Sequence, residues 1–91
     1  MTTDMLYQFP RIRYVAENGI CAQVAHIQTE ADEAFRELTA SPDIDALAME
    51  VMDVYHSAET ALRILEEKHG VDVQALMHRC YEKNEERGYY Q

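Results

Sequence analysis

Residues 43–70 read DIDALAMEVMDVYHSAETALRILEEKHG, and the predicted fold is built around this segment. Ser41 or Asp43 can cap the start of a helix here, and Gly70 can end it. Because the apolar residues recur three and four positions apart and cover more than one stripe, we expect a helix at 43–68 to be the central and most buried element. These residues are Leu47, Val51, Val54, Ala58, Ala61, Leu62 and Leu65.

Three further helices are predicted around this one. Pro10 can begin a short helix at 11–17, and Asn18-Gly19 can end it, since these residues tolerate the left-handed backbone of a helix stop. A second helix runs from about 21 to 38, and a fourth follows Asp72 as its cap. The inner face of the fourth helix is formed by Val73, Leu76, Met77, Cys80 and Tyr81. No stretch alternates with the period of two that is typical of strands, so the fold class is all-α.

The chain has 91 residues, which predicts a single helical domain over 1–91, a small bundle of about four helices. A lone domain of this size buries only about 60% of the surface that its unfolded chain exposes. We therefore expect self-association into a homodimer or homotetramer to complete the bundle. Met49, Met52 and Met77 are interpreted as core residues, and Cys21 and Cys80 as buried free thiols.

The charge of the chain restricts its partners. Eight basic and seventeen acidic residues give a formal net charge of −9. This charge disfavours binding to polymeric nucleic acid and to anionic membrane surfaces. A small phosphorylated ligand stays compatible with it, because a bound divalent cation would invert the local field. No segment has the pattern of a secretory signal or a membrane span, so we expect a cytoplasmic protein.

The acidic residues form pairs at helical spacing. His26, Glu30, Glu33 and Glu37 make one ridge along the border of the apolar face, while Asp32 and Arg36 point outward. The following helix carries Glu50 and Asp53 among apolar neighbours. Carboxylates held close together either take up protons or recruit a cation, and Mg²⁺ prefers such hard oxygen ligands. The alternative is that these acids are ordinary solvated borders of amphipathic helices.

The order of these pairs carries a resemblance to a known family. Glu30-x-x-Glu33, a gap across a helical turn, and Glu50-x-x-Asp53 before a long apolar helix resemble the MazG-type all-α nucleoside triphosphate pyrophosphohydrolases. The signature of that family is Glu-Glu-x-x-Glu followed by Glu-x-x-Asp. Thr29 stands here in place of the first glutamate, and Asp32 where many members have a small residue. The resemblance extends from YVAENGI at 14–20 to KNEERGYY at 83–90.

The resemblance implies a reaction and a site. It implies Mg²⁺-dependent, or Mn²⁺-dependent, hydrolysis of a nucleoside or deoxynucleoside triphosphate to the monophosphate and pyrophosphate, in a phage or bacterial protein. The implied metal ligands are Glu30, Glu33, Glu50 and Asp53, with Glu33 or Glu30 as the general base. Residues implied to contact the β and γ phosphates are Lys83, Asn84 and Arg87, whereas Arg63 and Lys68 are assigned to surface pairs with Glu59, Glu66 and Glu67. Two alternatives stay open: a phosphoribosyl-ATP pyrophosphohydrolase-like enzyme, and a non-catalytic helical dimerisation or regulatory module.

Overall fold

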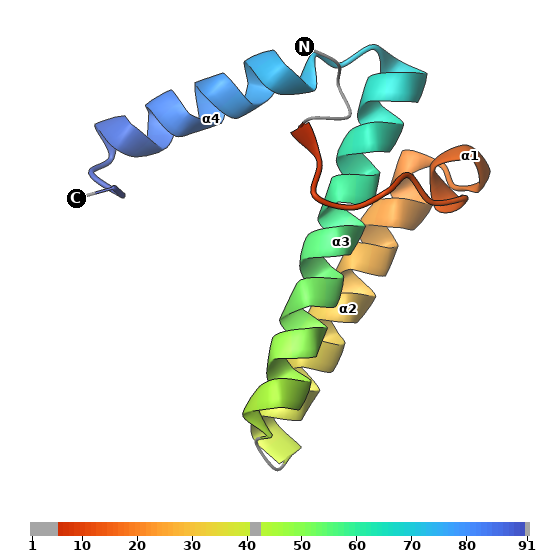
Figure 1. Cartoon of the computed structure of the whole chain (residues 1–91), viewed down its shortest axis with the longest axis vertical. Helices are drawn as coiled ribbons and strands as arrows, with labels where there is room; N and C mark the ends of the chain where they lie inside the picture. The colour runs from red at the N-terminus through yellow and green to blue at the C-terminus, as the bar shows by residue number, and fades with distance from the viewer. Residues whose placement is uncertain (1–5, 41–42, 91) are drawn as a thin grey trace.

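The structure is a computed structural model that describes residues 6–40 and 43–90 (Figure 1). Within these ranges it contains four α-helices and no strand, which confirms the predicted all-α fold class. The helices are α1 (Tyr14–Glu17), α2 (Ile20–Ala40), α3 (Ile44–His69) and α4 (Val73–Glu86). No helix in the described part of the chain combines the length and the apolarity needed to cross a bilayer.

The two long helices α2 and α3 form an antiparallel hairpin (Figure 1). The irregular segment 7–13, called the strap below, and α1 lie across the hairpin at its open end, beside the last turns of α3. Helix α4 follows Gly70 and projects away from the hairpin instead of folding back along it. The single chain is therefore a packed hairpin with one projecting helix.

The ends of α3 and the start of α4 follow from local hydrogen bonding. The Asp43 carboxylate accepts hydrogen bonds from the backbone amides of Asp45 and Ala46 at 3.0 and 3.3 Å, so it caps α3. Gly70 adopts the left-handed conformation, with φ of 68°, and ends α3. Asp72 caps α4 by accepting from the Ala75 amide at 3.0 Å. These boundaries were predicted correctly; Ser41, the other candidate cap, lies outside the described residues.

The first helix begins later than predicted and lacks the predicted left-handed stop, whereas its last residue, Glu17, is the one predicted. Residues 11–13 are not helical, and α1 covers Tyr14–Glu17 alone. It ends at Asn18, whose backbone is extended at φ −96° and ψ 142°, so no left-handed stop is used. The physical reason is that the backbone of the strap bonds to side chains of α3 in place of forming its own helical turns. Glu59 accepts from the amides of Gln8 and Phe9, and Arg63 donates to the Phe9 carbonyl at 2.8 Å.

The core lies where the strap, α1 and the C-terminal half of α3 meet. Its buried apolar residues are Tyr7, Val15, Ala61, Ile64 and Val73, and the buried polar residues beside them are Gln23, Ser57, Glu59, Thr60 and Arg63. The prediction that α3 is the central helix is thus confirmed for its C-terminal half.

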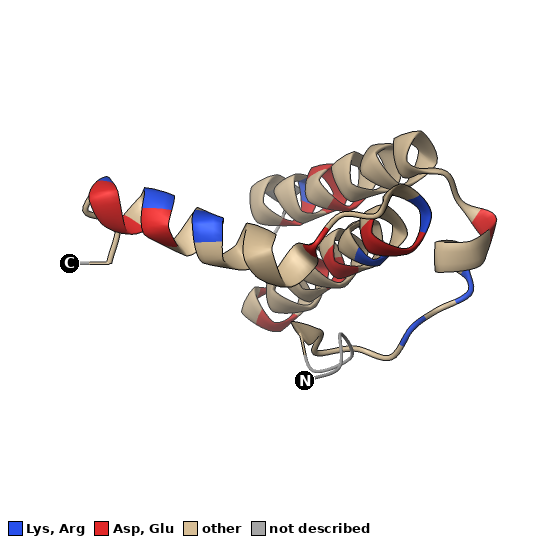
Figure 2. Cartoon of the chain, turned by 90° about the horizontal axis from the view of Figure 1, so that it is seen from above, with Lys and Arg blue, Asp and Glu red and all other residues tan. Residues whose placement is uncertain are grey.

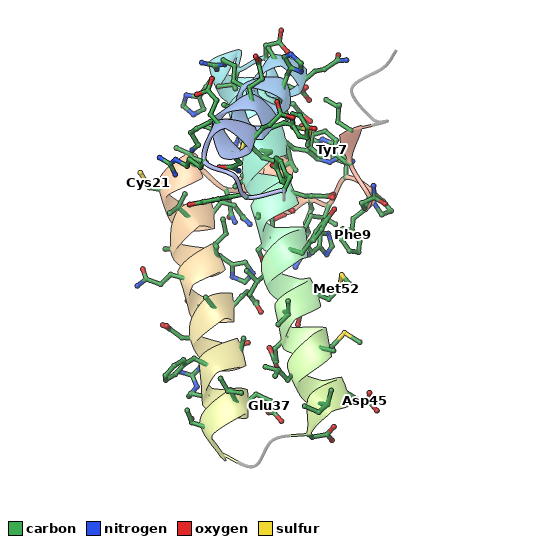
Figure 3. All side chains as sticks on the ribbon, turned by 90° about the vertical axis from the view of Figure 1, so that its left-hand side faces the viewer. Tyr7, Phe9, Cys21, Glu37, Asp45 and Met52 are labelled. Carbon is green, nitrogen blue, oxygen red and sulfur yellow. The ribbon has the colours of Figure 1, made fainter. Side chains whose placement is uncertain are left out.

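Much of the predicted apolar surface is exposed in the single chain. Met49, Met52 and Met77 are 63, 49 and 40% exposed, so their assignment to the core is wrong here. Figure 3 shows Met52 on the side of α3 away from α2, and Cys21 on the outer side of α2. Both cysteines are exposed free thiols, not buried ones.

The predicted inner face of α4 is also largely exposed. Val73 is buried and Leu76 is half-buried, whereas Tyr81 is 51% exposed. The reason is geometric, because α4 projects from the hairpin and its apolar side meets little of the same chain (Figure 1).

Candidate functional site

Facing carboxylates from α2 and α3 form the candidate site. Acidic residues occur on both helices of the hairpin (Figure 2). Glu30 of α2 and Glu50 and Asp53 of α3 each offer a carboxylate oxygen, and these oxygens all lie within 4.8 Å of one another. The antiparallel pairing of α2 and α3 therefore brings acids from the two predicted pairs together, which spacing along one helix cannot do. We call Glu30, Glu50 and Asp53 the acidic cluster.

Glu50 is the most perturbed member of the acidic cluster. Its Oε2 atom is buried and has no hydrogen-bond partner among the described residues. Removal from water raises the pKa of the Glu50 carboxyl, and the negative charges of Glu33 and Asp53 raise it further, with smaller contributions from Glu30 and Glu37. A proton or a cation would relieve this destabilisation.

The ridge predicted on α2 is present. His26 Nε2 lies 3.2 Å from Glu30 Oε1, and the His26 ring contacts the Tyr14 ring edge-on at 6.1 Å. Asp32 and Arg36 are exposed, as predicted for outward-pointing positions. Glu33 does not belong to the group of three carboxylates whose oxygens lie within 4.8 Å of one another. Its negative charge is nevertheless near enough to raise the pKa of the Glu50 carboxyl.

A cavity of about 230 Å³ with both polar and apolar walls adjoins the acidic cluster. Glu30 and Asp53 belong to its wall as well as to the cluster, so the two features are continuous. Gln23 forms another part of the wall; it donates to the Ser57 carbonyl at 3.1 Å and accepts from the Asn18 side chain at 3.0 Å. These bonds hold α2, α3 and the end of α1 in register around the cavity.

His56 also lines this cavity. Its ring is stacked on Phe9 at 4.3 Å between centroids, and Phe9 meets Tyr55 edge-on at 5.8 Å. The Nε2 atom of His56 is buried and has no hydrogen-bond partner among the described residues. Sequence reasoning missed both Gln23 and His56. The signal available for His56 was its position one turn after Asp53 on the same helix.

The basic residues predicted to contact phosphates lie on α4 and just after it. Asn84 Nδ2 donates to Cys80 Sγ at 3.6 Å, and the Arg87 guanidinium lies 6.0 Å from the centre of the Tyr89 ring. Lys83 is exposed on the projecting helix. Because α4 leads away from the hairpin, the single chain does not bring these three residues to the acidic cluster (Figures 1 and 2).

Arg63 and Lys68 have structural roles that the sequence did not predict. Arg63 is buried, not at the surface: it donates to the Phe9 carbonyl, and its guanidinium lies 4.2 Å from the centre of the Tyr7 ring. Lys68 Nζ donates to the carbonyls of Ala16 and Asn18 at 3.1 and 2.7 Å. Both cations therefore tie the N-terminal segments to α3.

The chain was compared with protein-family models, with curated proteins and with solved structures. No family model matches the sequence, and neither a curated protein nor a solved structure matches it. The resemblance to the MazG-type family stays a prediction that depends on the four acidic residues and their order.

Proposed function

We propose that the protein is a Mg²⁺-dependent nucleotide pyrophosphohydrolase that cleaves nucleoside or deoxynucleoside triphosphates between the α and β phosphates. The observation that carries the proposal is the Glu50 carboxylate: its Oε2 atom is buried and has no hydrogen-bond partner among the described residues, and one of its oxygens lies within 4.8 Å of carboxylate oxygens of Glu30 and Asp53. A buried charged oxygen without a donor is costly, and a hard cation is the ligand that suits several carboxylate oxygens at this spacing. The donor set therefore fits Mg²⁺, or Mn²⁺.

Four residues would hold the ion: Glu30, Glu50 and Asp53 of the acidic cluster, with Glu33 beside them. A bound divalent cation would neutralise phosphate charge and lower the pKa of a water molecule. The chain itself supplies the base. Glu33 is the proposed proton acceptor, because Glu30 is already engaged by His26 and lies within the close group of oxygens.

We further propose that two or four copies assemble and that the assembly completes the site. Self-association is supported by the apolar surface that stays exposed on α3, where a shallow groove has almost purely apolar walls. The groove is lined by Ile44, Leu47, Ala48, Val51, Met52 and Tyr55. An exposed apolar surface of this kind favours a protein interface. In an assembly, Lys83, Asn84 and Arg87 would have to reach phosphates bound by another copy, because α4 leads away from the cluster of its own chain.

Product analysis tests the reaction. The protein is incubated with each common nucleoside and deoxynucleoside triphosphate and with phosphoribosyl-ATP, in Mg²⁺ or in chelator, and pyrophosphate is distinguished from orthophosphate. We expect pyrophosphate release with Mg²⁺ only. Glu33→Gln should lower the rate by roughly 10²- to 10⁴-fold, as for loss of a general base, and Asp53→Asn should abolish it. Asp32→Asn is the matched control, since it removes one carboxylate next to Glu33 from the exposed side of α2.

Two results would contradict the proposal: no turnover of any of these substrates by the folded protein, or equal loss of activity in Asp32→Asn and Glu33→Gln. The open apolar groove also favours a second function, a non-catalytic helical dimerisation or regulatory module. That module predicts self-association without turnover. Turnover of phosphoribosyl-ATP alone would identify the related reaction in place of general triphosphate hydrolysis.

A further inference from the structure

The histidine beside the acidic cluster has no part in the proposed reaction so far. His26 Nε2 lies 3.2 Å from Glu30 Oε1, four positions along α2. Both residues also line the 230 Å³ cavity, together with Tyr14. The Glu30 carboxylate has two other near neighbours, the carboxylates of Glu50 and Asp53. Ionised carboxylates only accept hydrogen bonds, whereas an imidazole N–H donates one, so His26 is the neighbour that complements Glu30.

A second pair of the same kind occurs in different surroundings. On α4, His78 Nε2 lies 3.3 Å from Glu82 Oε1, again four positions apart. Both of these side chains are mostly exposed, at 75 and 58%, and α4 leads away from the acidic cluster (Figure 1). The Glu30 side chain is only 15% exposed, and the ring of its partner His26 contacts the Tyr14 ring edge-on at 6.1 Å between centroids. The pair on α2 is therefore packed beside the cluster, and the pair on α4 is its matched comparison.

A donor behind a carboxylate changes how that carboxylate binds a cation. Carboxylates that ligate metal ions are commonly hydrogen-bonded to a further protein group, which fixes their orientation. Glu30 has two oxygens, and the contact of Oε1 with His26 leaves Oε2 available to an ion shared with Glu50 and Asp53. A neutral imidazole that carries its proton on Nε2 supplies the donor and adds no positive charge to the site.

We propose that His26 is a positioning residue whose Nε2–H holds Glu30 Oε1 and so orients the Glu30 carboxylate towards a divalent cation in the acidic cluster. The inference rests on the proposed function for the presence of the ion, and it adds what orients one of the ligands. His26 does not bind the ion itself, since its effect passes through Glu30. Loss of such a donor weakens metal binding by roughly 10- to 100-fold.

Mn²⁺ binding followed by electron paramagnetic resonance tests this role without any need for turnover. The sharp spectrum of free Mn²⁺ broadens on binding, so a titration gives the Kd. Glu50→Gln shows which part of the binding belongs to the acidic cluster, because the chain carries seventeen acidic residues. His26→Phe keeps an aromatic ring beside Tyr14 and removes the donor, whereas the amide of His26→Gln can donate to the residue four positions on. His78→Phe makes the same change in the exposed pair on α4.

We expect the Kd of the cluster for Mn²⁺ to rise by at least about tenfold in His26→Phe and to stay within about threefold of wild type in His26→Gln and His78→Phe. Circular dichroism checks that each variant is folded. An unchanged Kd in folded His26→Phe overturns the inference. Tighter binding in His26→Phe also overturns it, because His26 would then compete with the ion for Glu30. Equal weakening in His26→Phe and His26→Gln overturns it as well, since the donor would not be the cause.

The two proposals fail separately. Weaker Mn²⁺ binding in His26→Phe, without turnover of any triphosphate by the wild type, supports the positioning role and contradicts the proposed enzyme. Turnover together with Mn²⁺ binding that is lost in Glu50→Gln but unchanged in His26→Phe supports the enzyme and contradicts the positioning role. If the folded wild type has no Mn²⁺ binding that depends on Glu50, the positioning role and the metal site are both overturned.

Discussion

Replacement of Glu59 by glutamine should loosen the strap that closes one side of the candidate site. The Glu59 side chain is buried, and its two oxygens accept from the backbone amide of Gln8 at 3.1 and 2.9 Å and from that of Phe9 at 3.2 Å. The strap places Phe9 against His56 and leads into Ile12 and Tyr14, which line the cavity. Glu59 is thus a structural anchor for one wall of the cavity, although it does not line the cavity itself.

The size of the effect follows from the bonds that are lost. In Glu59→Gln one carboxylate oxygen becomes an NH₂ group, which cannot accept from the Gln8 or Phe9 amide, and the charge that strengthened the other bonds is removed. Hydrogen bonds to charged groups contribute about 1.5–3 kcal/mol, so we expect the free energy of unfolding to fall by about 2 kcal/mol. For a domain of this size, such a loss lowers Tm by roughly 10 °C.

Urea unfolding followed by circular dichroism measures this loss. Several protein concentrations are needed, because self-association would make the apparent stability depend on concentration. Glu82→Gln, at an exposed position of α4, is the charge-matched control and should change the free energy of unfolding by less than about 0.5 kcal/mol. If Glu59→Gln is no more destabilised than this control, the strap is not held by the carboxylate and the argument is refuted.

Three further predictions concern the core, a tether and the acidic cluster. Ile64→Ala, at a fully buried position, should lower the free energy of unfolding by about 2–5 kcal/mol; a smaller loss in urea unfolding would contradict the position assigned to the core. Lys68→Met should cost about 1 kcal/mol in the same assay, because the carbonyls of Ala16 and Asn18 lose their donor, and an unchanged midpoint would contradict the tether. In chelator, the folded protein holds a proton on Glu50 that the unfolded chain releases, because the pKa of Glu50 is raised in the folded state. The contribution of this carboxyl to stability is therefore present below the ordinary glutamate pKa of 4.5 and is lost as pH rises through the folded pKa. Glu50→Gln should therefore unfold with a weaker decline in stability towards neutral pH than the wild type, and identical pH profiles would show that this carboxyl is not perturbed.

The acidic cluster was predicted in part from spacing alone. Acids three positions apart share a helix face, so the pairing of Glu50 with Asp53 follows from the helical repeat. The convergence of Glu30 with that pair depends in addition on α2 and α3 running antiparallel with those faces opposed, as they do in the hairpin. Gln23 and His56 could not be assigned in this way, because a lone glutamine or histidine on a helix has no spacing pattern that marks it.

The helical class, the boundaries of α3 and the start of α4 could be predicted from the sequence. Those features depend on caps and apolar repeats, which are interactions among residues a few positions apart, such as Asp43 with Asp45 and Ala46. The irregular strap, the projection of α4 and the exposure of the apolar side of α3 could not be predicted in this way, because they depend on contacts between distant parts of the chain. The strap depends on bonds such as that between Gln8 and Glu59, 51 positions apart, and no local propensity encodes such a contact. A helix pattern specifies which face is apolar, whereas the packing of the whole chain decides which part of that face is covered.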